Sequence, residues 1–154
     1  MKIIEMKAIG TVRSARKEVV DDGWDAVTSH VELDAAQFSA DALAGLEAFS
    51  HAEVTFYMDQ VDPAKIERGA RHPRNDKNLP KVGIWAQRGK NRPNQIGHTI
   101  CKILQIDGLK LHLQGLDAVD GTAVLDIKPW MQEFGPRGAL RQPTWVTEIM
   151  SRYW

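Results

Sequence analysis

Residues 51–59 read HAEVTFYMD, and residues 99–114 read TICKILQIDGLKLHLQ. In the first stretch every second residue from Ala52 to Met58 is apolar, which is the period-two pattern of a half-buried β-strand. The second stretch holds two strand-like runs on either side of Asp107-Gly108, a dipeptide that favours a tight two-residue hairpin turn. These stretches predict strands that pair in an antiparallel sheet.

Short strand-like runs also occur through the remainder of the chain. With the turn signals between them they predict seven or so strands, which is typical of an all-β antiparallel barrel or sandwich. One short helix is expected after Ser39, a good N-cap, because apolar residues recur from Ala42 to Phe49 at spacings of three and four. We therefore expect an all-β fold, a small antiparallel β-barrel of about seven strands with one short helix. The further strand candidates are Lys7–Arg13, His30–Leu33, Val82–Gln87 and Thr122–Lys128.

Length and composition place the chain among single-domain globular proteins. It has 154 residues, of which 43% are apolar and 26% charged, and this balance excludes a disordered or collagen-like chain. We expect residues 1–154 to form one domain. The one cysteine, Cys101, rules out an internal disulfide and makes a reducing, cytoplasmic compartment the default. No apolar run approaches the roughly 20 residues of a membrane helix, and Glu5 and Lys7 interrupt the first apolar stretch, so neither a membrane segment nor a secretory signal is expected.

The charges are balanced overall but unevenly distributed. The chain carries 20 basic and 20 acidic residues, yet residues 1–63 hold 5 basic and 12 acidic ones, whereas residues 65–92, the basic segment, hold 9 basic and 2 acidic ones. Between Arg71 and Gly97 the arginines alternate with prolines and glycines, so they stand on stiff loops that suit recognition of an anion. Two interpretations stay open: a patch for an anionic partner such as RNA, or loop charges that the acidic N-terminal part neutralises in space.

Several common site types are missing from the sequence. It has no GxGxxG or GxxxxGK[ST] loop and no CxxC or HExxH motif, and its five histidines lack metal-ligand spacing, so we expect neither a dinucleotide fold nor a metal. Two polar motifs remain. In GLDAVDG, Asp117 and Asp120 either cap the turn or bind hydroxyl or ammonium groups of a ligand. In LDIKPW, Asp126 and Lys128 share one strand face, either as an ion pair or as part of a polar site in a barrel mouth.

Five motifs, in order along nearly the whole chain, resemble one family. They are IGTVRS (9–14), GLEAFSH (45–51), RHPRN (71–75), VGIWAQRGKNRPNQIG (82–97) and LDAVDGTAVLDIKPW (116–130). The chain is similar to the TsaA-like proteins, the TrmO group of S-adenosylmethionine-dependent tRNA methyltransferases. The resemblance implies a β-barrel enzyme with S-adenosylmethionine as cofactor that methylates N6 of threonylcarbamoyladenosine next to the anticodon of tRNA. It also implies a homodimer, and Trp145, Tyr153 and Trp154 are expected as exposed aromatic residues suited to its interface.

Residue by residue, the resemblance implies cofactor contacts from the N-terminal loop, the turn after the FSH motif, the surroundings of RPNQIG and the LDAVDG turn. Arg71, Arg74 and Arg92 are expected to hold RNA phosphates or the threonyl carboxylate. No residue is assigned as a catalytic base. The expected cofactor-binding residues are Asp22, Gly23, Trp24, Asp59, Gln60, Arg88, His98, Gln114, Gly115, Leu116 and Asp117.

Two other functions keep the cofactor but change its use. In the first, the methyl acceptor is a small molecule or a protein instead of tRNA. In the second, the barrel is a binding module that holds S-adenosylmethionine without turnover.

Overall fold

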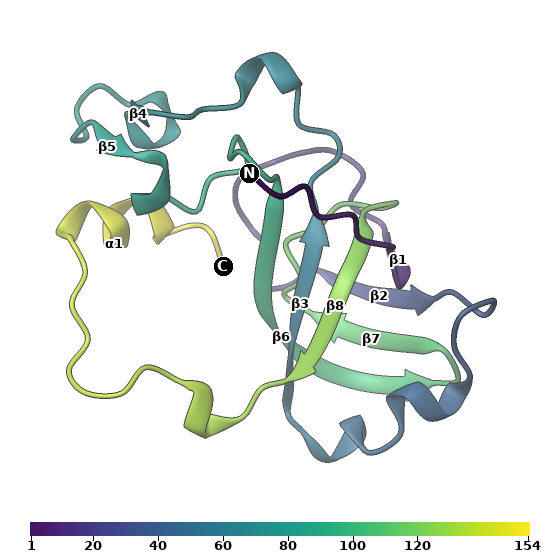
Figure 1. Cartoon of the computed structure of the whole chain (residues 1–154). Coiled ribbons are helices and arrows are strands. Elements are labelled where there is room, and N and C mark those ends of the chain that lie inside the picture. The colour runs from purple at the N-terminus through teal and green to yellow at the C-terminus, as the bar shows by residue number, and fades with distance from the viewer.

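Six strands close into a barrel at the centre of the fold (Figure 1). The computed structural model describes residues 1–154. Each strand pairs antiparallel with two neighbours, and the order around the barrel is β1-β2-β7-β6-β3-β8. This confirms the expected small antiparallel barrel, with six strands in its wall. The strands are β1 (Gly10–Ser14), β2 (Thr28–Leu33), β3 (His51–Tyr57), β6 (Ile96–Asp107), β7 (Lys110–Gln114) and β8 (Ala123–Pro129).

The predicted hairpin is formed by β6 and β7, with its turn one residue later than expected. Asp107 pairs with Lys110, so Gly108 and Leu109 are the two turn residues. Gly108 has a φ of +56°, a left-handed conformation that glycine adopts without a Cβ clash. The glycine therefore occupies the first turn position, and Asp107 is the last residue of β6.

The prediction of one continuous helix after Ser39 is wrong. Ala40–Leu43 and Leu46–Ala48 form two separate 3-10 turns, and the Ser39 side chain makes no capping hydrogen bond. Gly45 between them has a φ of +85°, which a continuous right-handed helix does not allow. Leu43 is buried in the core, so the spacing of the apolar residues marks which side chains face inward without specifying a continuous helix.

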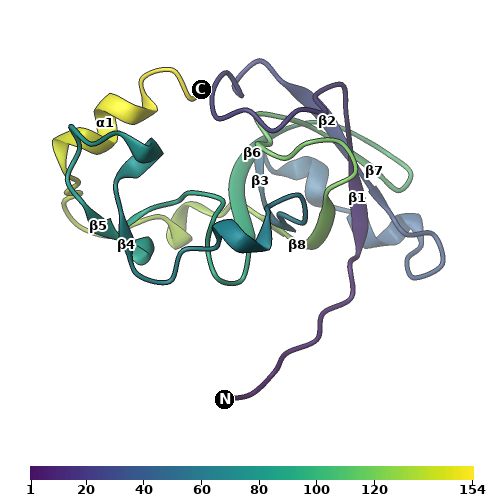
Figure 2. The same cartoon turned by 90° about the horizontal axis from the view of Figure 1, so that it is seen from above.

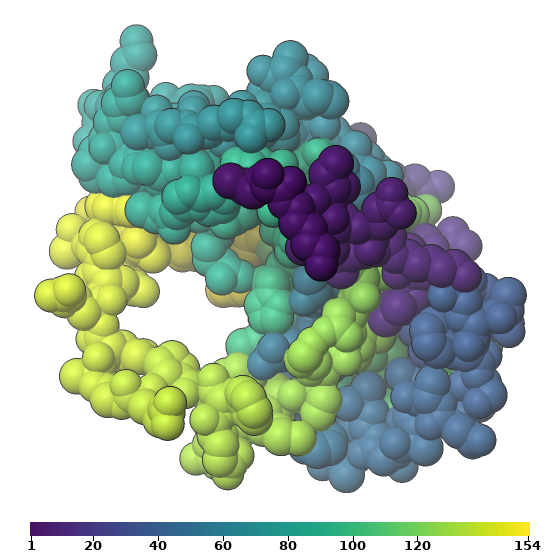
Figure 3. Space-filling view, in the orientation of Figure 1, coloured from purple at the N-terminus to yellow at the C-terminus, as the bar shows by residue number.

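Two segments lie outside the barrel wall. The basic segment contains a two-stranded ribbon of β4 and β5, and helix α1 lies beside it when the molecule is seen from the front and from above (Figures 1 and 2). The C-terminal segment leaves the barrel after β8, and an opening separates it from the strands (Figure 3). None of the helices has the length and apolar character needed to span a bilayer. The elements are β4 (Ala70–Arg71), β5 (Val82–Gly83), α1 (Thr144–Met150) and 3-10 turns at Pro63–Lys65, Pro73–Asn75, Ile84–Ala86 and Gln132–Phe134.

The strand predicted over Val82–Gln87 is correct only for its first two residues. A 3-10 turn follows and buries Ile84. The Gln87 side-chain amide donates hydrogen bonds to the carbonyl oxygens of Arg71 (3.0 Å) and Val82 (2.9 Å). These hydrogen bonds stabilise the turn, which stands where the sequence predicted a longer strand.

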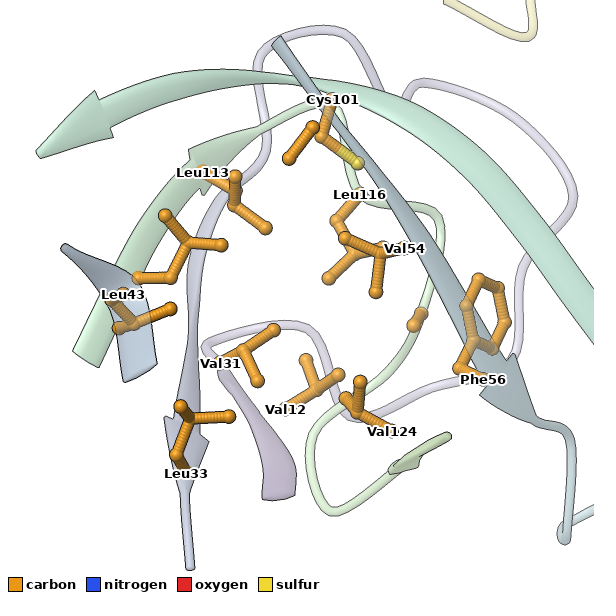
Figure 4. Packing of buried hydrophobic residues seen from close by; sticks show 13 residues of the cluster. Val12, Val31, Leu33, Leu43, Val54, Phe56, Cys101, Leu113, Leu116 and Val124 are labelled. Atoms are coloured by element: carbon orange, nitrogen blue, oxygen red, sulfur yellow. The ribbon is translucent and has the colours of Figure 1, made fainter. Parts of the chain in front are cut away.

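Inward side chains of the barrel strands form the core (Figure 4). Val12 of β1, Val54 of β3 and Leu111 of β7 are fully buried, and each stands at the inward phase of its strand. Cys101 packs among them. Burial and, second, the charge of Asp117 raise the pKa of the Cys101 thiol, which identifies it as a core residue and not a nucleophile.

Candidate functional site

Asp117, in the loop between β7 and β8, accepts hydrogen bonds from two hydroxyl groups. One belongs to Thr99 on β6 and the other to Tyr153, which follows α1. The residues on either side, Leu116 and Ala118, are buried, so the backbone of this loop is fixed and the carboxylate has a defined position. A carboxylate is thereby held next to the barrel core.

The backbone of the loop before β2 is hydrogen-bonded to the C-terminal residues next to Asp117. The N–H of Gly23 donates to the carbonyl oxygen of Arg152 at 3.0 Å, and the N–H of Trp24 donates to that of Tyr153 at 2.8 Å. On the other side, Trp154 lies against Gly115. We call residues 22–24, 114–117 and 152–154, together with Thr99, the Asp117 cluster. Three segments that are far apart in the sequence therefore meet in one site.

The protonation states in the cluster suit ligand binding. Burial, followed by the charge of Asp117 and the hydrogen bond to it, raises the pKa of Tyr153, so its hydroxyl stays protonated and acts as a donor. An ionised carboxylate has about four acceptor sites, and the two hydroxyl groups use two of them. Asp117 can therefore accept further hydrogen bonds from N–H or O–H groups of a ligand.

Other aspartates of the polar motifs have structural roles. The Asp120 carboxylate accepts the backbone N–H of Ser14 at 3.0 Å, so Asp120 fixes a turn. Asp126 forms an ion pair with Lys128, and both side chains are exposed on the outside of β8. Of the alternatives left open by the sequence, turn fixation holds for Asp120 and the ion pair holds for Asp126.

Seven of the eleven expected cofactor-binding residues lie in the Asp117 cluster. Leu116 is fully buried, so only its backbone can face a ligand. Arg88 and His98 adjoin the cluster: Arg88 Nη2 donates to the carbonyl oxygen of His98 at 2.6 Å, and His98 precedes Thr99. Asp59 and Gln60 lie in the exposed turn after β3, where no hydrogen bond or ion pair joins them to the cluster.

Part of the basic segment is neutralised by the acidic N-terminal part of the chain. The Arg74 guanidinium donates two hydrogen bonds to the Asp22 carboxylate, at 2.5 and 2.9 Å. Lys90 pairs with Asp21 at 2.7 Å. The interpretation of internal neutralisation therefore applies to Arg74 and Lys90, and Arg74 connects the basic segment to the Asp117 cluster.

The other two arginines expected to bind substrate have neutral partners. Arg71 Nη2 donates to Asn75 Oδ1 at 2.6 Å, and Arg92 Nη1 donates to the carbonyl oxygen of Gln87 at 3.1 Å. Both guanidinium groups keep an unneutralised charge. Five more basic residues of the segment are exposed and form no ion pair: Lys65, Arg68, Lys77, Lys81 and Arg88.

The pair of Asp22 and Arg74 predicts a dependence of stability on pH. Hydrogen bonds from Arg74, opposed by burial and helped by its charge, hold the pKa of Asp22 below the ordinary value of 3.8. Because the pKa of Asp22 is lower in the folded state, its pairing with Arg74 stabilises the protein above pH 3.8. This stabilisation is lost as the pH falls through the lower, folded-state pKa. We expect Arg74→Ala to lower the Tm near pH 7, and this difference from the wild type to shrink below about pH 4 in thermal unfolding. Arg71→Ala is the matched control, because its partner does not titrate; a deficit for Arg74→Ala that is the same at all pH values would contradict the prediction.

Four members of the cluster were not predicted as site residues from the sequence: Thr99, Arg152, Tyr153 and Trp154. Thr99 stands at an inward position of β6, two residues before buried Cys101, and a polar residue at that phase is the signal that could have identified it. Tyr153 was expected to be exposed, but it is partly buried and its hydroxyl faces Asp117. Trp145 is also partly buried, and only Trp154 is exposed as expected. No local pattern links Tyr153 to a residue 36 positions earlier.

A cavity of about 230 Å³ adjoins the cluster and shares Gln114 and Gly115 with it. A larger cavity of about 420 Å³ lies against β1 and β2, lined by Arg13 and His30, and contains none of the expected site residues. No group of three or more His, Cys, Asp or Glu side chains is arranged to hold a metal ion.

The structure is a small closed β-barrel with a polar cluster built from loops, and it differs from the nucleotide-binding folds that carry a glycine-rich loop. Residues 20–135 match the family described as the tRNA-methyltransferase O N-terminal domain. The chain belongs to this family.

The chain covers very different shares of the lengths of its relatives. The chain is 36% identical over 140 residues to the tRNA (adenine(37)-N6)-methyltransferase of Escherichia coli, covering 85% of this chain and 59% of that protein. It is 31% identical over 137 residues to a probable S-adenosyl-L-methionine-binding protein of Methanothermobacter thermautotrophicus, covering 88% of this chain and 96% of the relative. The human tRNA (adenine(37)-N6)-methyltransferase is 34% identical over 102 residues, covering 66% of this chain, which spans 23% of the human protein.

A solved structure shares the fold. The crystal structure of TrmO from Pseudomonas aeruginosa superposes with a TM-score of 0.72 at 27% identity, covering 91% of this chain and 62% of that one. The similarity therefore includes the barrel and most of the remaining chain.

Proposed function

We propose that this chain is an S-adenosylmethionine-dependent methyltransferase that methylates N6 of threonylcarbamoyladenosine in tRNA. The observation that carries the proposal is the meeting of residues 22–24, 114–117 and 152–154 at one carboxylate with free acceptor capacity. The family and the names of the E. coli and M. thermautotrophicus relatives support the cofactor and the reaction class.

The residues of the cluster fit the proposed cofactor. The Asp117 carboxylate can accept hydrogen bonds from an ammonium group or from the ribose hydroxyls. The Gln114 side chain, whose amide donates to the carbonyl oxygen of Asp25 at 3.0 Å, lines the adjoining cavity. Arg88 donates to the backbone carbonyl oxygen of His98 next to the cluster, whereas the His98 side chain contacts Thr55 and Glu53 on β3. When bound, the sulfonium group supplies an electrophilic methyl group, so the contribution of the protein is to align the acceptor. Such alignment lowers a barrier by roughly 7–11 kcal/mol at the upper end.

Exposed basic residues support tRNA as the acceptor. Lys65, Arg68, Lys77 and Lys81 form no ion pair, and Arg71 and Arg92 keep unneutralised charges, so the segment has cations available for phosphates. A cytoplasmic location is part of the same proposal, because it brings the protein to tRNA.

Labelled S-adenosylmethionine distinguishes the candidate functions. Incubation with bulk tRNA should transfer label to tRNA, and excess cofactor should raise the Tm because it binds the folded state. Label in small molecules or protein would replace tRNA as the acceptor, and a Tm increase without transfer would indicate a binding module. Absence of a Tm increase at millimolar cofactor would reject the proposal.

We propose further that the protein is a homodimer. Phe134 and Leu140 are 78% and 77% exposed in the C-terminal segment that follows β8, and contact with a second copy would bury these apolar side chains. Sedimentation should show a species of about twice 17.3 kDa at micromolar concentration. The double variant Phe134→Asp, Leu140→Asp should sediment as a monomer with an unchanged Tm for the barrel; a wild type that sediments as a monomer would contradict the proposal.

A further inference from the structure

The larger cavity, of about 420 Å³, lies on the outer face of the barrel, where β1, β2 and β7 run side by side (Figure 1). Its volume is within the range of roughly 300–1,000 Å³ that small-molecule sites have. Arg13, His30 and His112 line it, and each alternates along its strand with buried core residues, so all three side chains point outward. None of the lining residues belongs to the Asp117 cluster. This cavity is therefore separate from the proposed cofactor site.

Three basic side chains stand next to one another across this face, and we call Arg13, His30 and His112 the basic row. Arg13 on β1 pairs with His30 on β2, and His30 pairs with His112 on β7. The centroids of the two imidazole rings are 5.1 Å apart. Like charges directly opposite each other destabilise a sheet, so the row costs stability whenever the histidines are protonated and no anion lies over it. Such a local conflict is typical of a binding site.

The N–H donors of the basic row are largely unoccupied. Arg13 uses its Nε atom, which donates to Glu32 at 3.1 Å, and its two terminal nitrogens have no partner. Neither the His30 ring nor the His112 ring forms a hydrogen bond. The other three histidines each have a hydrogen-bond partner: His51, His72 and His98. Guanidinium and imidazolium groups form strong charge-assisted hydrogen bonds with phosphate oxygens, so the row has the free donors that a phosphate group needs.

The remaining wall of the cavity offers partners for hydroxyl groups. The Thr28 hydroxyl has no partner, and the Ser14 hydroxyl only accepts a hydrogen bond, from the N–H of Arg16, so both can donate to a ligand. Asp120 uses Oδ1 for the Ser14 N–H, which leaves Oδ2 free to accept. Leu104, 45% exposed at the bulge of β6, adds an apolar contact. This wall suits the hydroxyl-bearing part of a phosphorylated compound.

The charge of this face depends on the protonation of the two histidines. The charged groups around them come from β1, β2, β7 and the loop before β8: Arg13, Glu32, Lys110 and Asp120. From β6, only the uncharged Leu104 and Gln105 lie beside them. The two cations and the two carboxylates cancel, so protonation of the histidines makes the face positive. Burial, followed by the charges of His112 and Lys110, holds the pKa of His30 below the ordinary value of 6.5. An anion over the row should favour the protonated rings and raise this pKa.

We infer that this cavity is a second ligand site, which binds a small phosphomonoester with its phosphate over the basic row and its hydroxyl groups against Asp120 and Thr28. The site does not depend on the function proposed above, because it shares no residue with the Asp117 cluster. Its affinity rises as the pH falls through the titration of the two imidazoles, since their protonation supplies positive charge and two further donors.

Calorimetric titration of the full-length protein with ribose 5-phosphate tests the inference. Ribose should not bind, because it lacks the phosphate, and inorganic phosphate should bind roughly tenfold more weakly, because it lacks the hydroxyl groups. Arg13→Gln should weaken binding of ribose 5-phosphate roughly tenfold, through the loss of a charge-assisted hydrogen bond. Its Tm without ligand should barely change, since an exposed ion pair contributes little to stability. Arg68→Gln, which removes an exposed arginine of the basic segment, is the matched control and should bind like the wild type.

NMR of the histidine rings locates the anion. Sulfate is the probe, because its charge stays constant over the range in which histidine titrates. It should shift the ring resonances of His30 and His112 and raise their pKa values, while the other three histidines serve as internal references. The dissociation constant for sulfate should fall roughly tenfold between about pH 7.5 and pH 5.5, and this dependence should vanish in the double variant His30→Gln, His112→Gln.

Opposite results overturn the inference. Ring shifts confined to His72, or loss of binding in Arg68→Gln but not in Arg13→Gln, would assign the anion to the basic segment. Equal affinity for ribose 5-phosphate and dimethyl phosphate would indicate a site for a nucleic-acid phosphodiester in place of a phosphomonoester. Absence of ribose 5-phosphate binding at millimolar concentration would leave the cavity without this ligand. None of these results would affect the proposed function, which is tested separately through the binding of S-adenosylmethionine.

Discussion

Replacement of Gly97 by alanine should lower the free energy of unfolding by about 3 kcal/mol, which is the upper part of the usual cost of overpacking. Gly97 in β6 pairs directly with Phe56 in β3. A Cβ atom at position 97 would lie 2.2 Å from Cε2 and 2.3 Å from Cζ of the Phe56 ring. The ring is only 2% exposed, so it cannot move away without disturbing the core. In thermal unfolding the Tm should fall by about 10 °C.

A second substitution separates this clash from a general preference for glycine. Leucine at position 56 lacks the two ring atoms that come closest, so Gly97→Ala should cost much less in a Phe56→Leu background, with a coupling energy of about 1–3 kcal/mol. Gly89→Ala is the control, because Gly89 is exposed and a Cβ there meets nothing within 4 Å. Equal costs of Gly97→Ala in both backgrounds would show that the ring does not cause the effect.

Period-two patterns made the barrel predictable, since one buried face leaves a direct trace in the sequence. The alternation over residues 51–59 corresponds to β3, and the two runs around Gly108 correspond to β6 and β7. The spacing from Ala42 to Phe49 was ambiguous, because two tight turns around a glycine with positive φ also bring apolar side chains to one side. The position of the one α-helix, in Thr144–Met150, had no comparable signal.

The site was predictable only through the family resemblance, because its geometry depends on contacts between distant residues. Asp22 and Arg74 were expected in separate roles, yet they are 52 positions apart and bind each other. The Asp117 motif alone left turn capping and ligand binding open, and only the contacts distinguish Asp117 from Asp120. Tyr153 lies in the site because the C-terminal residues are hydrogen-bonded to the loop before β2. No periodic pattern in the sequence predicts such a contact.

Replacement of Asp117 by asparagine should raise the dissociation constant for S-adenosylmethionine roughly ten- to a hundredfold, under the function proposed above. Hydrogen bonds to a charged group contribute about 1.5–3 kcal/mol, and about 1.4 kcal/mol corresponds to a factor of ten. Asparagine keeps the size of the side chain but loses the charge and half of the acceptor atoms. Thr99 and Tyr153 now donate to different oxygens of Asp117, so in the variant one of these hydroxyl groups faces an amide N–H2 group, and the acceptor capacity left for a ligand falls. Calorimetric titration of the cofactor measures the change.

Asp120→Asn supplies the matched comparison, because it makes the same chemical change three residues further along the same loop. Asp120 is engaged with the backbone N–H of Ser14, so its replacement should lower the stability by about 1 kcal/mol and leave the cofactor affinity unchanged. An equal loss of binding in both variants would indicate a disturbed loop instead of a lost contact. Wild-type affinity in Asp117→Asn would remove Asp117 from the cofactor site, since no neighbouring carboxylate of the cluster other than Asp22, which Arg74 already engages, could replace its charge.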